Sequence, residues 1–328
     1  MTFLLMFLIA AAVIAWSVLG PRALRRAAPY LARMPRAATL GHLGLIASWA
    51  AAALAIGPMF AWILTGPEVL SPDTTEVCQR CLATASPIAG VSIRTGLPTV
   101  ALLVAPVLVA AVGLGMSAVH AARAWRRARS DGSDLQTRTT WHRIAGRRVR
   151  VLEQDDPTVF ALPRAHGGVI ISEGALRLLD DDEVRAVLAH EDAHVRQRHH
   201  LIMLVATTIS APVRWVPLVD SAMSAIRQYL EIAADNAARR AVSTTALASA
   251  LLKLEPHHPE VGAHHAALHA GGPNRVQQLV ARPDAPRNGA VAAAGVVAYL
   301  LLSATVTAAI YASYLLAANA CLPGAAGF

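Results

Sequence analysis

Residues 189–195 of the chain read AHEDAHV, the pattern H-E-x-x-H inside a strongly helical run. At 3.6 residues per turn, His190 and His194 lie one turn apart on the same face of a helix. Their imidazoles can therefore converge on one Zn²⁺, which prefers tetrahedral coordination. Glu191 lies beside the pair, where it can accept a proton from the attacking water. The stretch predicts a zinc site with a general base next to it.

The residues before the motif argue against a chance match among the 13 histidines of the chain. Residues 180–182 are three aspartates that can cap a helix, and Glu183 follows in the first turn, where negative charge is favourable. Val184 and Val187 then contribute to an apolar stripe that leads into the motif. The motif is therefore predicted on an amphipathic helix with a buried face.

A second segment is predicted to complete the site, because a catalytic zinc uses three protein ligands and keeps an open position for water. Residues 229–235 read YLEIAAD and place carboxylates among apolar neighbours on a helix. We expect Glu231 to be the third ligand. Asp235, on the same face, is expected to fix the tautomer of a ligating histidine through a hydrogen bond. The alternative is an ordinary helix whose acids pair with Arg239 and Arg240.

The composition indicates an integral membrane protein. Of the 328 residues, 55% are hydrophobic and 15% are charged, whereas soluble proteins carry about 25% charged residues. The formal net charge of +8 comes almost entirely from arginines that lie beside apolar runs. We interpret these arginines as an orientation signal and expect no direct contact with nucleic acid.

Four apolar runs are long enough to cross the bilayer as helices. They cover residues 3–19, 40–64, 97–119 and 291–318. Arginines follow the first and third runs, so the positive-inside rule places those loops in the cytoplasm and both termini outside. A signal peptide, the rival interpretation of the first run, would carry its positive charge before the apolar residues.

The expected fold is a mainly α membrane protein with four transmembrane helices and an inserted α+β zincin-like metallopeptidase domain. Its expected parts are three transmembrane helices with an extracellular loop at 65–96, a cytoplasmic zinc domain, and a last transmembrane helix with a short outside tail, at residues 1–120, 121–287 and 288–328. Within the zinc domain, strands are predicted at 148–152, 158–162 and 169–172, and Ser172 is predicted to cap a short helix.

Residues 201–219 are apolar enough to span a membrane, although they include Arg214 and two prolines. A crossing there would put Glu231 about 30 Å from the histidines, and one zinc could not bind both. We therefore expect a non-spanning path. The segment would lie on the membrane surface, re-enter the membrane, or pack as a buried helical hairpin.

With both halves of the site in hand, the chain resembles the BlaR/MecR-type family of membrane-embedded zinc metallopeptidases, which are gluzincins. The resemblance covers about residues 149–240, together with the layout of three spans before the domain and one after it. It lies in the stretches FALP, VIISEG, VLAHEDAH and EIAAD, at residues 160–163, 169–174, 187–194 and 231–235.

This resemblance implies a cytoplasmic-facing zinc endopeptidase with a regulatory role, which relieves repression through cleavage of a winged-helix repressor. It implies zinc ligation by His190, His194 and Glu231, with Glu191 as the base and Asp235 behind the ligands. The best-known members carry a penicillin-binding sensor domain after the last span. Only residues 319–328 follow that span here, so we expect no β-lactam sensing by that route.

Two alternatives remain at this stage. One is a quality-control metallopeptidase of the HtpX type, which shares H-E-x-x-H and a later glutamate and would cleave many misfolded membrane proteins. The other is a non-catalytic receptor that uses the zinc fold as a binding scaffold, although an intact Glu191 speaks against it. The expected partners are a protein substrate and the lipid bilayer, and whether the chain forms homo-oligomers is left open.

Several smaller expectations follow from the same layout. The substrate peptide is expected to lie extended beside an exposed strand edge at 169–171, and the candidate oxyanion donors are His166 and Tyr229. Cysteines 78, 81 and 321 fall outside the membrane in this topology, where a disulfide can persist. His199, His200 and the histidines of residues 257–269 are interpreted as solvated, because no carboxylate cluster accompanies them.

Overall fold

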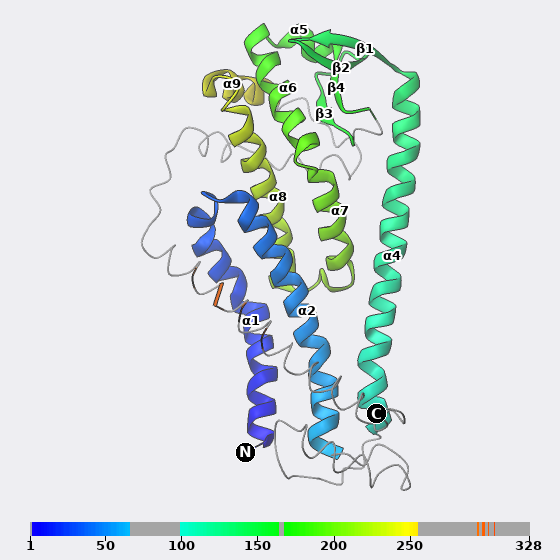
Figure 1. The fold of residues 1–328 in the computed structure, drawn as a ribbon, viewed down its shortest axis with the longest axis vertical. Coiled ribbons are helices and arrows are strands. Elements are labelled where there is room, and N and C mark those ends of the chain that lie inside the picture. The colour runs from blue at the N-terminus through cyan, green and yellow to red at the C-terminus, as the bar shows by residue number, and fades with distance from the viewer. Residues whose placement is uncertain are drawn as a thin grey trace, which may run out of the picture.

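The computed structural model describes residues 2–65, 99–163 and 167–254, together with five single positions between 294 and 305. Three long helices form one end of the molecule, and a small sheet with shorter helices forms the other (Figure 1). The expected last span lies outside the described residues except for these five positions. The loop after Thr65, His166, the three cysteines and the histidines of residues 257–269 also lie outside them.

The elements follow the chain in a simple order. The long helices are α1 (Thr2–Leu31), α2 (Pro35–Thr65) and α4 (Thr99–Thr137). The strands are β1 (Thr139–Ile144), β2 (Arg147–Leu152), β3 (Val159–Ala161) and β4 (Val169–Ser172). The remaining helices are α5 (Glu173–Leu178), α6 (Asp181–Arg196), α7 (His199–Ser210), the 3-10 turn η2 (Ala211–Val213), α8 (Pro217–Ala238) and α9 (Thr244–Leu254).

Two stretches of the described chain are long and apolar enough to cross a membrane: Pro35–Leu54 in α2 and Leu108–Arg127 in α4. The stretch in α4 is almost wholly exposed, and its Leu114 side chain is 72% exposed. An apolar surface of this length that the rest of the structure leaves exposed is suited to contact with lipid. The expected first span at 3–19 is helical, and the expected total of four spans stays a prediction.

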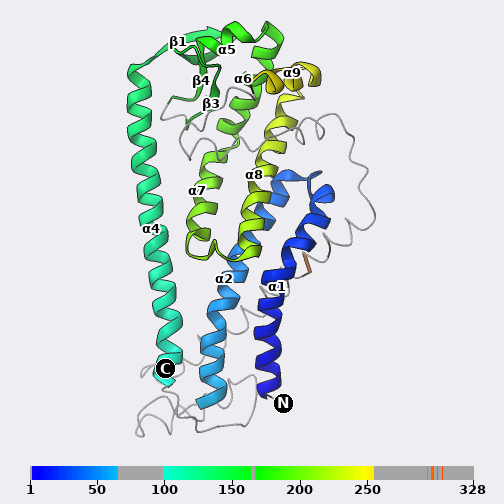
Figure 2. The same ribbon diagram turned by 180° about the vertical axis from the view of Figure 1, so that it is seen from behind.

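The hairpin of α7 and α8 packs against the long helices in the middle of the molecule, between the sheet end and the end that holds the N-terminus. Its turn points toward the end of the molecule that holds the N-terminus, as both views show (Figures 1 and 2). One apolar core joins α8 to α1 and α2, and it includes Leu24, Ile46, Val219 and Met223. Residues 201–219 thus cover most of α7, the turn after it and the first residues of α8, as the buried helical hairpin among the expected paths.

The four strands form one sheet in the order β1-β2-β4-β3. Strands β2 and β4 are parallel, and the other two pairs are antiparallel. Strand β4 therefore lies in the interior of the sheet, with Ile170 and Ile171 fully buried. The prediction of an exposed edge at 169–171 was wrong, because β2 and β3 occupy both edges of that strand.

Strand β1 was not predicted from the sequence. Its residues are mostly polar and exposed, so they lack the alternation that marks a half-buried strand. It forms a hairpin with β2 through Ala145 and Gly146, whose φ angles are +50° and +76°. Two consecutive positive φ values are the geometry of a tight two-residue hairpin turn.

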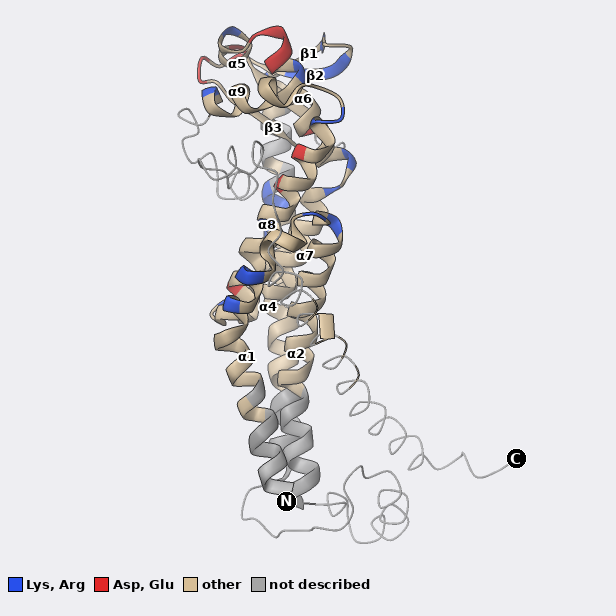
Figure 3. Cartoon of the chain, turned by 90° about the vertical axis from the view of Figure 1, so that its left-hand side faces the viewer, with Lys and Arg blue, Asp and Glu red and all other residues tan. Residues whose placement is uncertain are grey.

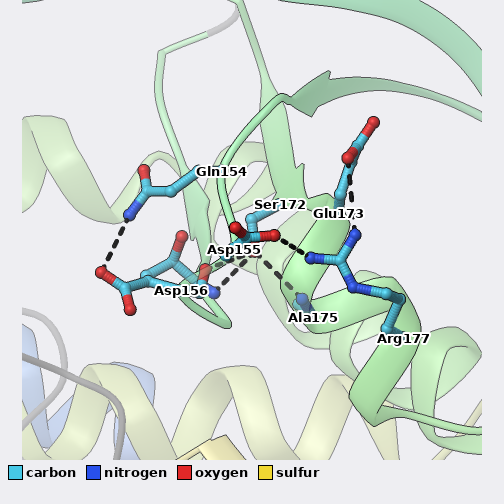
Figure 4. Close-up of polar contacts among 8 residues, drawn as sticks. Gln154, Asp155, Asp156, Ser172, Glu173, Ala175 and Arg177 are labelled. Carbon is cyan, nitrogen blue, oxygen red and sulfur yellow. Dashed lines mark hydrogen bonds and ion pairs between the residues drawn. The ribbon is translucent and has the colours of Figure 1, made fainter.

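Ser172 joins the sheet to the helices, as predicted. Its Oγ accepts hydrogen bonds from the amides of Ala175, at 3.1 Å, and Thr158, at 2.9 Å, and donates to the carbonyl of Asp156 at 2.7 Å (Figure 4). The side chain thus caps α5 and fastens the loop before β3. Gly174 lies so close to this loop that an added Cβ would fall 1.8 Å from the carbonyl oxygen of Asp155.

Candidate metal centre

Helix α6 carries the H-E-x-x-H motif and begins at a complete capping box. The Asp180 carboxylate accepts hydrogen bonds from the amides of Asp182 and Glu183, both at 2.9 Å, and the Glu183 carboxylate accepts from the Asp180 amide at 2.9 Å. Each bond satisfies a backbone donor that the helix start leaves unpaired. This local order fixes where the motif falls on the helix.

Glu183 also ties α6 to α9. It accepts hydrogen bonds from Ser249 at 2.6 Å and from Lys253 at 2.7 Å, although its side chain is almost fully buried. Burial by itself raises the pKa of Glu183, but the bonds from Lys253 and Ser249 outweigh that effect, so the pKa lies below its usual value. The carboxylate therefore stays ionised at neutral pH.

Three predicted ligands come together at the middle of the molecule, between α6 and α8. The Nε2 atoms of His190 and His194 lie 3.0 Å apart. Glu231 Oε2 lies 3.5 Å from His190 Nε2, and Glu231 Oε1 lies 3.6 Å from His194 Nε2. All three side chains are buried.

This geometry fits a zinc ion. Four ligands at the usual zinc distances of about 2.0–2.1 Å lie about 3.4 Å from one another in a tetrahedron. The three separations are close to that value, and the set of two imidazoles and one carboxylate is one that zinc prefers. The residues present can therefore hold a zinc ion with little movement.

Asp235 lies behind the first histidine, as its spacing from Glu231 predicted. Its Oδ1 atom is 3.0 Å from His190 Nδ1, and both side chains are buried. A proton on Nδ1 donated to this carboxylate leaves the lone pair of Nε2 directed at Glu231 and the metal position. The contact fixes the tautomer that a metal ligand requires.

His199 plays the matching part for the second histidine, and the sequence did not reveal it. Its side chain is buried, with Nδ1 2.9 Å from His194 Nδ1 and Nε2 3.3 Å from Gln197 Oε1. Burial lowers its pKa to about 4, and the Glu231 carboxylate opposes that shift. A neutral His199 accepts from His194 Nδ1–H and donates to Gln197. Its interpretation as a solvated residue was wrong, because the left-handed turn at Arg198 folds it back under the motif.

Gln197 extends this chain of hydrogen bonds to two further elements. Its Nε2 donates to the carbonyl of Ala233 in α8 at 3.4 Å, and its Oε1 accepts from Arg36 Nε, at the start of α2, at 3.3 Å. The second histidine is thereby linked through His199 and Gln197 to a long helix of the bundle. The bond to Ala233 also holds the end of α6 against α8, where the carboxylate ligand lies.

The other two motif-region residues differ in exposure. Glu191 is buried on α6 beside the histidines. Asp192 is partly exposed and forms ion pairs with Arg147 of β2 and with Arg196. Of these two neighbouring acids, Glu191 is thus shielded from solvent beside the histidines, whereas Asp192 is partly exposed and paired with arginines.

Tyr229, a candidate oxyanion donor, lies at the contact of α8 with α2. Its ring centroid is 5.3 Å from that of His42, and its hydroxyl is buried without a hydrogen-bond partner among the described residues. Burial raises the pKa of Tyr229 to about 12, so the hydroxyl keeps its proton. Its role toward an oxyanion stays a prediction.

Known proteins resemble this chain in the part that holds the site. Residues 142–282 match the profile of peptidase family M48, a family of zinc-dependent peptidases. The protease HtpX homolog of Pelotomaculum thermopropionicum is 32% identical over 148 residues, which cover 33% of this chain and 52% of the relative. No solved structure matches the chain.

Two further relatives carry the same name. The protease HtpX homolog of Pyrococcus furiosus is 26% identical over 174 residues, covering 42% of this chain and 58% of the relative. That of Desulforapulum autotrophicum is 43% identical over 68 residues, covering 20% of this chain and 22% of the relative. The chain thus spans between 22% and 58% of these relatives. The matched segment is similar to the metallopeptidases of this family, and the BlaR/MecR-type resemblance stays a prediction.

Proposed function

We propose that this chain is a membrane-bound zinc endopeptidase of the HtpX type, which cleaves damaged or misassembled membrane proteins. The observation that carries the proposal is the convergence of His190, His194 and Glu231 at separations suited to zinc. The names of the relatives favour this function over cleavage of a single winged-helix repressor.

The zinc would be held by the Nε2 atoms of His190 and His194 and by the Glu231 carboxylate. When bound, zinc supplies a Lewis acid that polarises the scissile carbonyl and acidifies the attacking water. Glu191 would take the proton of that water and later pass it to the leaving amine nitrogen. Asp235 and His199 would keep both imidazoles in the required tautomer and orientation.

The free edge nearest the motif helix belongs to β3 rather than β4. Leu162 N donates to Gly168 O at 2.8 Å, and Ser172 N donates to Thr158 O at 2.9 Å, so even-numbered residues of this segment bond to β4. In an antiparallel pair the alternate residues turn their backbone groups the other way. The backbone groups of Val159 and Ala161 are therefore directed away from β4, and we place the extended substrate beside β3.

The proposed orientation is supported by the positions of the arginines. Basic residues flank the sheet-side ends of α1, α2 and α4, which the positive-inside rule assigns to the cytoplasm. The proposed enzyme is therefore a multi-pass protein of the cell membrane with its zinc domain on the cytoplasmic side. A cysteine-labelling experiment with a membrane-impermeant reagent on intact cells tests this orientation.

The function is tested by quantitative proteomics of cells that carry the wild type or Glu191→Gln. The variant keeps the zinc ligands and the fold but lacks the base, so we expect many membrane proteins to accumulate in it. Asp182→Asn is the matched control, an acid-to-amide change at an exposed position of the same helix. Accumulation of one regulator alone would favour the repressor hypothesis, and no difference between wild type and variant would refute proteolysis.

A further inference from the structure

The level of the membrane surface can be read from α4. Its exposed aliphatic side chains reach up to Val119, and exposed arginines begin at Arg123, with the exposed ring of Trp125 among them. Apolar side chains that face outward indicate lipid, and arginines indicate the headgroup layer. The edge of the hydrocarbon layer therefore crosses α4 between these two residues. In Figure 3 the tan turns of α1 and α2 that adjoin the grey ends of these helices likewise carry no charged residue.

The turn of the α7–α8 hairpin lies below that edge. Ser117 of α4 donates a hydrogen bond to the carbonyl of Thr208 at 2.7 Å, and the Cβ position of Gly113 is 3.7 Å from the Pro212 side chain. Gly113 precedes Arg123 by ten residues, which is about 15 Å along a helix. The turn therefore enters the hydrocarbon layer from the sheet side. Trp215 at its tip is 81% exposed, and Arg214 beside it is exposed as well, so the tip carries one charge that needs polar partners within the layer.

The same contacts give the height of the metal centre by two routes. The first route follows α7. Thr208 lies beside Ser117, which is about 9 Å below Arg123 along α4. His199 is about 14 Å above Thr208 along α7, so His199 lies about 5 Å above Arg123. Along α8, Glu231 is fourteen residues beyond Pro217, or about 21 Å above the turn, which places it about 6 Å above Arg123. The two routes agree.

A third observation is independent of both helices. Gln197, three residues after the second motif histidine, accepts a hydrogen bond from Arg36 at 3.3 Å. Arg36 lies at the start of α2, next to the short connection from α1, and the arginines of this region are expected at the lipid headgroups. Of the neighbouring arginines, Arg33 lies in the connection itself, and Arg22, Arg25 and Arg26 lie in the last three turns of α1. The end of the motif helix is therefore at headgroup level.

A polar stripe on α8 runs from the turn to this level. Asp220, Ser224 and Gln228 are all exposed, and their spacing of four residues places them on one side of the helix. Gln228 is one turn before Glu231. A polypeptide that leaves a membrane helix needs partners for its backbone groups, because lipid offers none. The stripe supplies hydrogen-bonding groups along the route from the lipid to the metal centre.

From these observations we propose that the metal centre lies in the headgroup layer, about 5 to 10 Å outside the hydrocarbon, and takes peptide bonds directly next to a membrane-spanning segment. This inference rests on the proposed function and adds its substrate class: the juxtamembrane residues of membrane-anchored polypeptides. At about 3.3 Å per extended residue, the cleaved bond lies about two to three residues beyond the hydrocarbon edge.

The cleavage test uses full-length enzyme in proteoliposomes with a single-span substrate that carries one bait sequence, chosen from the proteomic cleavage sites. In one substrate the bait follows the span directly, and in the other a 15-residue helical spacer of the EAAAK type raises it by about 22 Å. We expect the spacer to slow cleavage by about tenfold or more, because the anchored bond no longer reaches the site. Equal rates would overturn the inference while leaving the endopeptidase function intact.

Cleavage that is the same in wild type and Glu191→Gln would instead remove the proposed function, and the substrate class with it. The depth of the α7–α8 hairpin in the membrane is then still tested by tryptophan fluorescence in vesicles of brominated phospholipid, where bromine quenches tryptophans that lie in the hydrocarbon layer. The difference in fluorescence between the wild type and Trp215→Phe gives the signal of Trp215. The difference between the wild type and Trp141→Phe gives the signal of a tryptophan in the sheet. We expect bromine to quench most of the Trp215 signal and little of the Trp141 signal, and equal quenching of the two would contradict the placement.

Discussion

Replacing Asp235 by asparagine tests how much the buried carboxylate contributes to metal binding. The wild-type contact joins His190 Nδ1 to a carboxylate oxygen at 3.0 Å, with both side chains buried. Asparagine keeps the shape and an acceptor oxygen but loses the charge, and a charge-assisted hydrogen bond is about twice as strong as a neutral one. With charged bonds contributing about 1.5–3 kcal/mol, the loss is about 1 kcal/mol or slightly more.

A loss of that size raises the zinc Kd by about five- to tenfold, since 1.4 kcal/mol corresponds to tenfold. The assay is competition for zinc between the purified protein and a chelator of known affinity, with the Asp182→Asn protein as control. Circular dichroism establishes that both variants are folded. An unchanged zinc Kd in folded Asp235→Asn protein would refute the assigned role of this carboxylate.

Three further changes test other contacts. His199→Leu removes the acceptor that orients the second motif histidine, and we expect the zinc Kd to rise by about ten- to hundredfold in the same competition assay; wild-type affinity would contradict this role. Lys253→Met removes a hydrogen bond that lowers the pKa of Glu183. A depressed carboxyl pKa stabilises the fold until the pH falls through the folded-state pKa. The variant, whose Glu183 pKa is less depressed, is therefore expected to unfold at a higher pH than the wild type in an acid titration followed by circular dichroism. Coincident titration curves of the two proteins would argue against this role of Lys253. Gly174→Ala forces a methyl group onto a backbone carbonyl, so we expect loss of about 3 kcal/mol or more in thermal unfolding, whereas Gly115→Ala, whose Cβ meets nothing within 4 Å, serves as the tolerated control; equal melting temperatures would be inconsistent with the close approach.

Local signals in the sequence were enough for the parts of the site that lie on regular helices. The aspartates at 180–182 and Glu183 predicted the start of α6, and Asp180 is its N-cap. The spacing of Asp235 from Glu231 predicted which acid would lie behind a histidine, because helix periodicity determines which residues share a face. In each case the relevant contacts are made within one helix or between two recognisable ones.

The misses have a different physical origin. His199 follows a residue in the left-handed conformation, so its direction depends on a turn that periodicity does not describe. The open edge of the sheet depends on strand order, and β1 lacked the apolar alternation that would have revealed a fourth strand. The depth of the α7–α8 hairpin required contacts between segments distant in sequence, such as Ser117 with Thr208.

The central claim is that one zinc ion is held by two distant parts of the chain. Zinc K-edge absorption spectroscopy of the purified full-length protein, combined with metal analysis, addresses it directly. The account predicts one zinc per chain with two imidazole nitrogens and a carboxylate oxygen, and loss of the oxygen ligand in Glu231→Ala. A zinc environment that is unchanged in Glu231→Ala, or a wild-type protein that binds no zinc, would contradict it.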